Sequence, residues 1–312
     1  MTIHRNRNHD KRSISRYPKH NGRRFIAAQV VLVSVGMVHP GTVSSRDLLF
    51  EQTWNDTRSL VLRAHKYSSY VFSAFLTAHI TNTSLIPLYT RSVQGSSKYL
   101  LLTRPYYQSW PLAEPLIVIA PLVVHLVSGI ALRVYRRQVL LKQLGAETRG
   151  DRKTIAWPKL SGTSVLGYFA VPLVVGHTAI NRMLPLWVDG GSSSIGLDFV
   201  SHGLNVGPTW YRIAGRVGYA ALVAAVGCHV VWGWAQWMGF KPDQVQGRST
   251  SVTAEKMVNR RWWALQGISA AVVITWLAGG MGVVGRAGKV SGWVGKHYDE
   301  LLRRVPYLAS HV

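Results

Sequence analysis

The sequence predicts an all-α, polytopic membrane protein with about five transmembrane helices, four of which form a bundle built from two parallel two-helix repeats. Three observations predict this fold. The apolar residues gather in long blocks that contain almost no charge. Basic loops separate the blocks, and one spacing of tyrosine, histidine and proline occurs twice. A block of about 20 apolar residues matches the roughly 30 Å thickness of the hydrocarbon core of a bilayer.

Five blocks reach the length of a transmembrane helix. A soluble helix of this length carries a polar face, and these blocks mostly lack one. Their approximate bounds are 67–89, 113–135, 164–188, 213–238 and 262–284. The spanning region therefore contains about five helices.

The charge of the chain is strongly positive, with 36 Lys and Arg against 13 Asp and Glu. Such an excess also occurs in proteins that bind nucleic acid. Here the basic residues flank the apolar blocks, where they set the orientation of the helices and contact anionic lipid head groups. We therefore expect the lipid bilayer, and no nucleic acid, as a partner.

The segments divide by composition. Residues 1–24 form a basic, flexible arm, and residues 25–62 form an interfacial segment followed, from about residue 41, by a polar connector with some helix. The apolar part at 25–38 is short for a span, so an interfacial or re-entrant segment is the first interpretation and a sixth span the alternative. The remaining divisions are a first two-helix repeat at 63–135, a basic cytosolic loop at 136–163, a second repeat at 164–238, a loop and fifth span at 239–285, and an amphipathic tail at 286–312.

The loop charges predict the orientation. With five spans, the arm and the loops at 136–163 and 239–261 lie on one side, and these three segments hold most of the basic residues. The positive-inside rule places that side, with the N-terminus, in the cytosol. The tail mixes basic and aromatic residues at near-helical spacing, which is typical of an interfacial helix. A partner-binding tail is the alternative.

A repeat connects the first four blocks. Blocks one and three each contain a tyrosine, a histidine nine residues later and a Pro-Leu pair eight residues after that. These residues are Tyr70, His79 and Pro87, and Tyr168, His177 and Pro185. Blocks two and four each contain His-aliphatic-Val-x-Gly-x-Ala, which begins at His125 and at His229. Each repeat has two spans, so the two copies share an orientation.

Each of the four repeat helices thus carries one histidine near the middle of the bilayer. An ionisable group at this depth usually faces the protein interior and indicates function. Two interpretations are open. A neutral imidazole can hydrogen-bond across helices as a structural contact, or two imidazoles from different helices can act as the axial ligands of haem b.

Small residues beside the histidines distinguish the four positions. His125 with Gly129, and His229 with Gly233, place a glycine one turn after the ligand, where a porphyrin can lie against the helix. We therefore predict His125 and His229 as one axial pair that holds the haem iron. His79 and His177 form a second pair that either binds another haem or only hydrogen-bonds.

Other site chemistry is less well supported. Zinc or copper would need a Cys, Asp or Glu cluster that does not accompany the histidines. Arg182, one turn after His177, either pairs with a haem propionate or lipid phosphate, or extends toward the interface. The sequence contains no nucleophile-elbow, P-loop or dinucleotide motif, so we do not expect an enzyme.

Four stretches carry a family resemblance: LLTRPYYQ at 101–108, HLVSGIALR at 125–133, GHTAINR at 176–182, and the segment 229–237. Together they resemble the transmembrane domain of the fungal mitochondrial outer-membrane adapter family, over about residues 63–285. The His-x-x-x-Gly pattern is also similar, more distantly, to the haem-ligand helix of the succinate dehydrogenase cytochrome b subunits.

The resemblance implies a multi-pass protein of the mitochondrial outer membrane. Such adapters recruit a bridge-like lipid-transfer protein of the vacuolar sorting machinery and support mitochondrial lipid homeostasis and organelle contact. Their cytosolic arm binds this partner through a Pro-x-Pro-type motif, whereas the first 62 residues here contain only Pro18 and Pro40. The alternative is a b-type haem cytochrome that transfers electrons within the membrane. A lipid scramblase or carrier is third, and would need a polar groove open to lipid.

Overall fold

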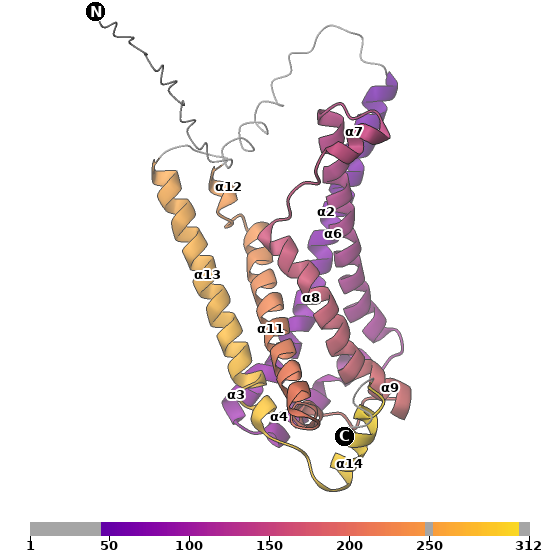
Figure 1. Cartoon of the computed structure of the whole chain (residues 1–312), viewed down its shortest axis with the longest axis vertical. Helices are drawn as coiled ribbons and strands as arrows, with labels where there is room; N and C mark the ends of the chain where they lie inside the picture. Colours follow the sequence, from indigo (N-terminus) through magenta and orange to yellow (C-terminus); the bar gives the residue numbers. More distant parts are fainter. Residues whose placement is uncertain (1–44, 247–251, 306–312) are drawn as a thin grey trace, which may run out of the picture. The chain divides into compact units, whose positions relative to one another are not determined.

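The computed structural model of the chain describes residues 45–246 and 252–305, all of them within one compact unit, Ser44–Val312. The predictions for the basic arm and for the 25–38 segment lie outside the described residues. Every described element is helical, so the all-α fold is confirmed. Figure 1 shows the long helices side by side, with short helices at both of their ends.

Five helical stretches are long and apolar enough to cross a membrane, as the sequence predicts. They are Gln52–Thr90, Pro115–Gln143, Gly162–Asp189, Thr209–Trp237 and Val252–Arg286. Their outward faces expose large apolar side chains, for example Val127, Val175 and Ile274 at 58%, 62% and 66%. Such faces are stable in lipid and costly in water.

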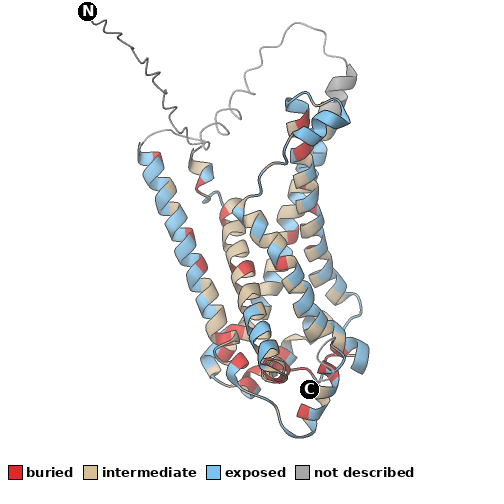
Figure 2. Ribbon diagram, in the orientation of Figure 1, coloured by how far each residue is buried: buried red, intermediate tan, exposed pale blue. Residues whose placement is uncertain are grey.

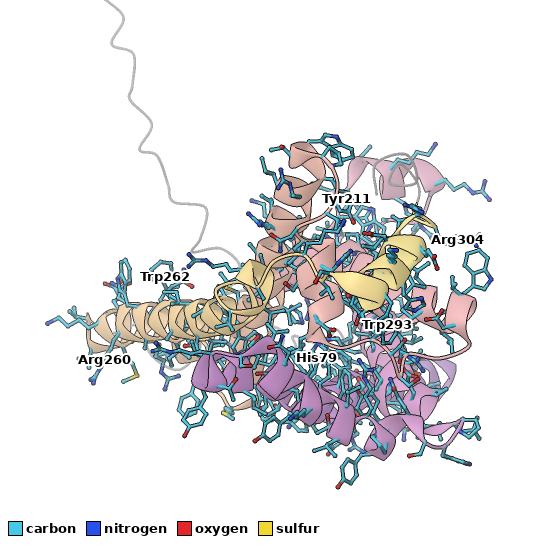
Figure 3. The ribbon with its side chains drawn as sticks, turned by 90° about the horizontal axis from the view of Figure 1, so that it is seen from below. His79, Tyr211, Arg260, Trp262, Trp293 and Arg304 are labelled. Carbon is cyan, nitrogen blue, oxygen red and sulfur yellow. The ribbon has the colours of Figure 1, made fainter. Side chains whose placement is uncertain are left out.

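The main helices of these spans are α2 (Ser45–Ile80), α6 (Ala120–Gln143), α8 (Gly162–Thr178), α11 (Thr209–Trp237) and α13 (Val252–Gly280). α2 packs along α6 as a first hairpin, and α8 packs along α11 as a second hairpin. α13 packs against α11 and against the end of the first span. Seen from below, α13 stands at one side of the other helices, with Arg260 and Trp262 on its surface (Figure 3).

Short helices cover the end of the bundle at which α13 finishes. They are α3 (Ile86–Thr90), α4 (Val93–Thr103), α5 (Pro105–Gln108), α9 (Leu184–Asp189), α10 (Leu197–Gly203), the 3-10 turn η4 (Val284–Arg286) and α14 (Gly292–Leu302). The buried residues gather at this end, the lower one in Figure 2. At the opposite end lie α7 (Arg149–Thr154) and α12 (Asp243–Gln246).

Three of the spans contain a five-residue π-helical segment: η1 (Thr81–Leu85), η2 (Pro115–Ile119) and η3 (Ala179–Met183). Each begins six residues before a proline, at Pro87, Pro121 and Pro185. Proline lacks the N–H of the regular helical bond and its ring displaces the carbonyl four residues earlier, so the helix widens there. η1 follows His79 and η3 follows His177, so the repeated histidine–proline spacing produces the same backbone feature in both hairpins.

The connector expected before residue 63 is helical where it is described. α2 begins at Ser45 and continues into the span without a break. Ring contacts with α6 stabilise this extension: Trp54 stacks on Tyr135 at 5.1 Å between ring centroids, and the Arg58 guanidinium lies over the same Tyr135 ring. The sequence predicts only some helix here, because the partner of this polar helix is the equally extended end of α6 rather than a hydrophobic core.

The tail helix α14 turns its apolar side to protein. Tyr298, Leu301 and Leu302 are buried in one cluster with Phe199 of α10. Trp293, by contrast, is 82% exposed. The amphipathic pattern of the tail therefore reflects packing on α10, and Trp293 lies on its exposed side.

Candidate functional site: two histidine pairs

The bundle brings the four repeat histidines together in two pairs. His125 of α6 and His229 of α11 lie 5.9 Å apart between ring centroids, with their planes at 85°. His79 of α2 and His177 of α8 lie 5.9 Å apart, with their planes at 81°. Each pair joins one hairpin to the other, so the four imidazoles lie at the interface between the hairpins.

Backbone carbonyls fix the orientation of one of these pairs. His125 Nδ1 lies 3.2 Å from the carbonyl oxygen of His65, and His229 Nδ1 lies 2.9 Å from that of Thr163. A carbonyl oxygen can only accept, so each Nδ1 carries a proton, and in the neutral imidazole the lone pair is then on Nε2. No hydrogen-bond partner for either Nε2 occurs within the described residues.

The two bonds occupy matching positions of the repeat. His65 and Thr163 are separated by the same 98 residues as His79 and His177. Each hairpin therefore holds its second-helix histidine with the carbonyl of the equivalent residue on its first helix. This is the outer-shell arrangement that orients metal-binding histidines.

His65 is a fifth histidine of the site, which the sequence interpretation missed. Its ring stacks on His125 at 4.0 Å between centroids. Its Nδ1 lies 3.0 Å from the His125 carbonyl oxygen and 3.1 Å from Ser128 Oγ. His65 precedes the first apolar block, so the search for histidines within the spans does not include it. The signal for His65 in the sequence is its position about four helical turns before His79, which places both histidines on one face of α2.

The glycines beside the predicted pair have different surroundings. A Cβ added to Gly129 would lie 3.2 Å from Cε1 of His65, so the His65 ring already fills that space. A Cβ added to Gly233 would meet nothing within 4 Å. The room expected beside both histidines thus exists beside Gly233 only.

The other pair has a different environment. Asn181 Nδ2 donates to the His177 carbonyl and to Tyr219 Oη, both at 2.8 Å, and lies 3.4 Å from His177 Nδ1. His79 stacks on Phe75, and its ring has no hydrogen-bond partner among the described residues. A cavity of about 210 Å³ lies beside His177, between α8 and α11.

Arg182 is held by protein groups. Its Nε donates to Glu114 Oε1 at 2.7 Å, a second nitrogen bonds the same carboxylate, and a third donates to Ser192 Oγ at 2.9 Å. Nearby, Arg104 donates to the Ser192 carbonyl. This Arg–Glu clamp connects the two hairpins at the covered end, an arrangement that neither interpretation of Arg182 anticipated.

Burial affects the groups around this clamp. Desolvation lowers the pKa of Arg104 and raises the pKa of the Tyr107 hydroxyl. Arg104 nevertheless remains a cation, because an arginine pKa lies far above neutrality. In the part of the chain that the structure describes, no group of three or more His, Cys, Asp or Glu could hold a metal ion.

Residues 172–289 match the family model for the transmembrane domain of MDM10-complementing protein 1. The family resemblance is confirmed. The match to the MDM10-complementing protein 1 domain includes His177, Arg182, His229 and Gly233, together with the fifth span. The matched family domain is a transmembrane domain, in agreement with the apolar helices of this part of the chain. No curated protein and no solved structure matches the chain.

Proposed function

We propose that this chain is a non-enzymatic protein of the mitochondrial outer membrane, with its N-terminus in the cytosol. It acts in lipid homeostasis and organelle contact as an adapter for a bridge-like lipid-transfer protein of the vacuolar sorting machinery. The observation that carries this proposal is the match of residues 172–289 to the MDM10-complementing protein 1 transmembrane domain. The five spans supply the membrane anchor that an adapter needs.

The end of the bundle that carries α7 is the candidate docking face. Arg149, Arg152 and Lys153 lie on this short helix and are exposed. A buried arginine, Arg137, holds the segment in place by donating to the carbonyls of Arg152, Ile155 and Ala156 at 2.6 to 2.7 Å. A fixed basic surface of this kind favours an acidic partner surface.

Proximity labelling from the full-length chain in cells tests the adapter role. The lipid-transfer partner should be enriched, and reversing the charge of the three exposed α7 residues should reduce that enrichment. The matched control reverses the exposed Lys296 on α14, at the other end of the bundle. Normal mitochondrial lipid composition after deletion of the chain, in cells that lack the endoplasmic reticulum–mitochondrion tether, would reject the role.

A second candidate function is a b-type cytochrome, and the paired histidines favour it. His125 and His229 present rings from different helices, with each Nδ1–H donating to a carbonyl and each Nε2 without a hydrogen-bond partner among the described residues. Two such imidazoles are what axial ligation of haem b requires. Haem, when bound, would supply one-electron transfer. The residues fit ligation at this pair, while His65 limits the room beside Gly129.

An absorption spectrum of the purified protein, oxidised and reduced, tests this candidate. Haem ligation predicts a reducible Soret band that is lost in His125→Ala and His229→Ala. His297→Ala, which changes a part-exposed histidine near α9, is the control and should retain the band. A colourless and correctly folded protein, expressed with adequate haem, would exclude the cytochrome.

A further inference from the structure

The cavity beside His177 has the dimensions of a lipid tail site. It is lined mainly by apolar residues of α8, α10 and α11, with Leu302 of α14 at its covered end. On α11 the lining runs from Tyr211 to Leu222, a rise of about 16 Å at about 1.5 Å per residue. This length is close to one leaflet, which is half of a hydrocarbon core of roughly 30 Å.

Glycines leave this space open. A Cβ added to Gly176 of α8 or to Gly218 of α11 would meet nothing within 4 Å. The volume of about 210 Å³ is smaller than the pockets of roughly 300 Å³ or more that enclose whole small ligands. It therefore suits part of a larger molecule, such as one chain of a lipid whose remainder stays in the bilayer.

Two arginines stand at the interfacial end of the same helix. Arg212 and Arg216 directly follow Tyr211 and Gly215, which both line the cavity. Arg212 donates to Thr209 Oγ1, and Arg216 donates to Asn205 Oδ1. Neither guanidinium pairs with a carboxylate within the described residues.

The Arg212 side chain lacks a carboxylate partner, and one of its hydrogen-bond donors is also unpaired among the described residues. Its Nε is buried and has no hydrogen-bond partner among the described residues. A phosphate at this depth would supply the acceptor oxygens and the negative charge that these two side chains lack.

We propose that this cavity binds one acyl chain of a phospholipid, with the lipid phosphate bound by Arg212 and Arg216. The polar groups mark the interfacial end and the apolar lining continues into the leaflet, so the site retains a lipid in place. The proposal stands on the cavity and the charges, and it goes beyond the adapter role.

Photo-crosslinking of the full-length chain in nanodiscs tests this site. The probe is phosphatidylglycerol with a diazirine in one acyl chain, in a phosphatidylcholine bilayer. Crosslinks should map to residues 211–222. In Gly218→Leu the new side chain occupies the cavity, and crosslinking there should fall about tenfold, because the lipid loses buried methylene contacts.

Gly267→Leu is the matched control, because a Cβ at this α13 glycine also meets nothing within 4 Å. It should crosslink like the unchanged protein. The double variant Arg212→Gln and Arg216→Gln should lose the preference for the phosphatidylglycerol probe over a phosphatidylcholine probe.

Equal crosslinking in Gly218→Leu and Gly267→Leu would overturn the acyl-chain site. An unchanged head-group preference in the double arginine variant would overturn the phosphate contact. Loss of a Soret band in Gly218→Leu, with no lipid crosslink in the unchanged protein, would assign the cavity to haem instead. None of these outcomes depends on recruitment of a lipid-transfer protein.

Discussion

The two hairpins share backbone features and differ in the side chains and cavities that lie between their helices. Each has a π-helical segment after its first histidine, and each holds its second histidine with a carbonyl of the facing helix. In the first hairpin the His65 ring fills the space beside Gly129. In the second, Thr163 stands at the equivalent position, and a cavity lies farther along the hairpin beside His177.

This difference separates the features that both hairpins need for folding from those that can bind a ligand. Features that occur in both hairpins follow from proline position and from the hydrogen bonding that lipid makes obligatory. Features that occur once are free to serve a ligand. At the position of Gly176, for example, the first hairpin has Ala78, 98 residues earlier. The second hairpin is therefore where a ligand is expected.

The largest effect should come from the fifth span, which contacts the two hairpins differently. Gly279 of α13 lies so close to the π-helical segment η1 of the first span that an added Cβ would overlap the carbonyl of Ser84. Because backbone cannot move aside as a side chain does, Gly279→Ala should destabilise the protein by about 3 kcal/mol. Thermal unfolding in detergent measures the change.

The contact of α13 with the second hairpin should tolerate more. A Cβ added to Gly227 of α11 would lie 3.0 Å from Cγ2 of Val273, a side chain that can shift. Gly227→Ala should cost about 1 kcal/mol, and Gly267→Ala should be neutral or stabilising by up to about 1 kcal/mol. An equal effect at Gly279 and Gly227 would contradict the difference between the two contacts.

The next effect concerns the Arg–Glu clamp between the hairpins. Arg182 and Glu114 are 22% and 20% exposed, so removing either leaves a largely buried charge. Arg182→Gln should cost about 2 kcal/mol, less than a fully buried pair. The double variant with Glu114→Gln should cost less than the sum of the two single variants. Additive losses would show that the clamp does not couple the hairpins.

Sequence reasoning could predict the spans and could group the repeat histidines, whereas their role as haem ligands stays a prediction. Length and apolar composition determined all five helices, because the bilayer fixes both. The matching repeat positions favoured grouping His125 with His229 and His79 with His177, and each of these pairs lies 5.9 Å apart between ring centroids. Some helix was expected in the connector at 41–62, but its unbroken continuation into the span was not, since that depends on contacts such as Trp54 on Tyr135.

The environment of the histidines needed three-dimensional packing. A glycine one turn from a histidine suggests room, yet His65 fills it beside Gly129 and nothing fills it beside Gly233. Arg182 likewise has a partner, Glu114, 68 residues earlier in the chain. Periodicity shows which face a residue lies on, but not which distant side chain meets it.

Exchanging one residue between the hairpins should have a smaller effect. His65→Thr gives the first hairpin the residue that the second has at Thr163. The His125 bond should persist because its acceptor is a backbone carbonyl, while the contacts of His65 Nδ1 with the His125 carbonyl and Ser128 Oγ are lost, at a cost of about 1 kcal/mol. Thr163→Ala is the control and should leave the unfolding temperature nearly unchanged. Loss of fold in His65→Thr would mean that the hairpins are not equivalent in framework.

The smallest effect should come from the tail, which packs on α9 and α10 of the second half of the chain. Burial, and then the charge of Asp198, which accepts a hydrogen bond from Tyr298 at 2.9 Å, raise the pKa of this hydroxyl. The protonated form is thus favoured in the docked tail. Docking should be fully stable below the ordinary tyrosine pKa of about 10 and weaken as pH rises above it. Hydrogen exchange of residues 292–302, followed from neutral to alkaline pH, measures this.

Tyr298→Phe separates this titration from that of the other tyrosines. The variant loses the bonds to Asp198 and to the Ser194 carbonyl, so exchange of α14 should be faster by a modest factor at neutral pH, where about 1 kcal/mol is lost. It should then lack the additional alkaline increase, because no hydroxyl remains to ionise. If hydrogen exchange of α14 accelerates equally above pH 10 in the variant and in the unchanged chain, another group controls tail docking. Ionisation of Tyr298 then does not control the packing of α14 on α9 and α10.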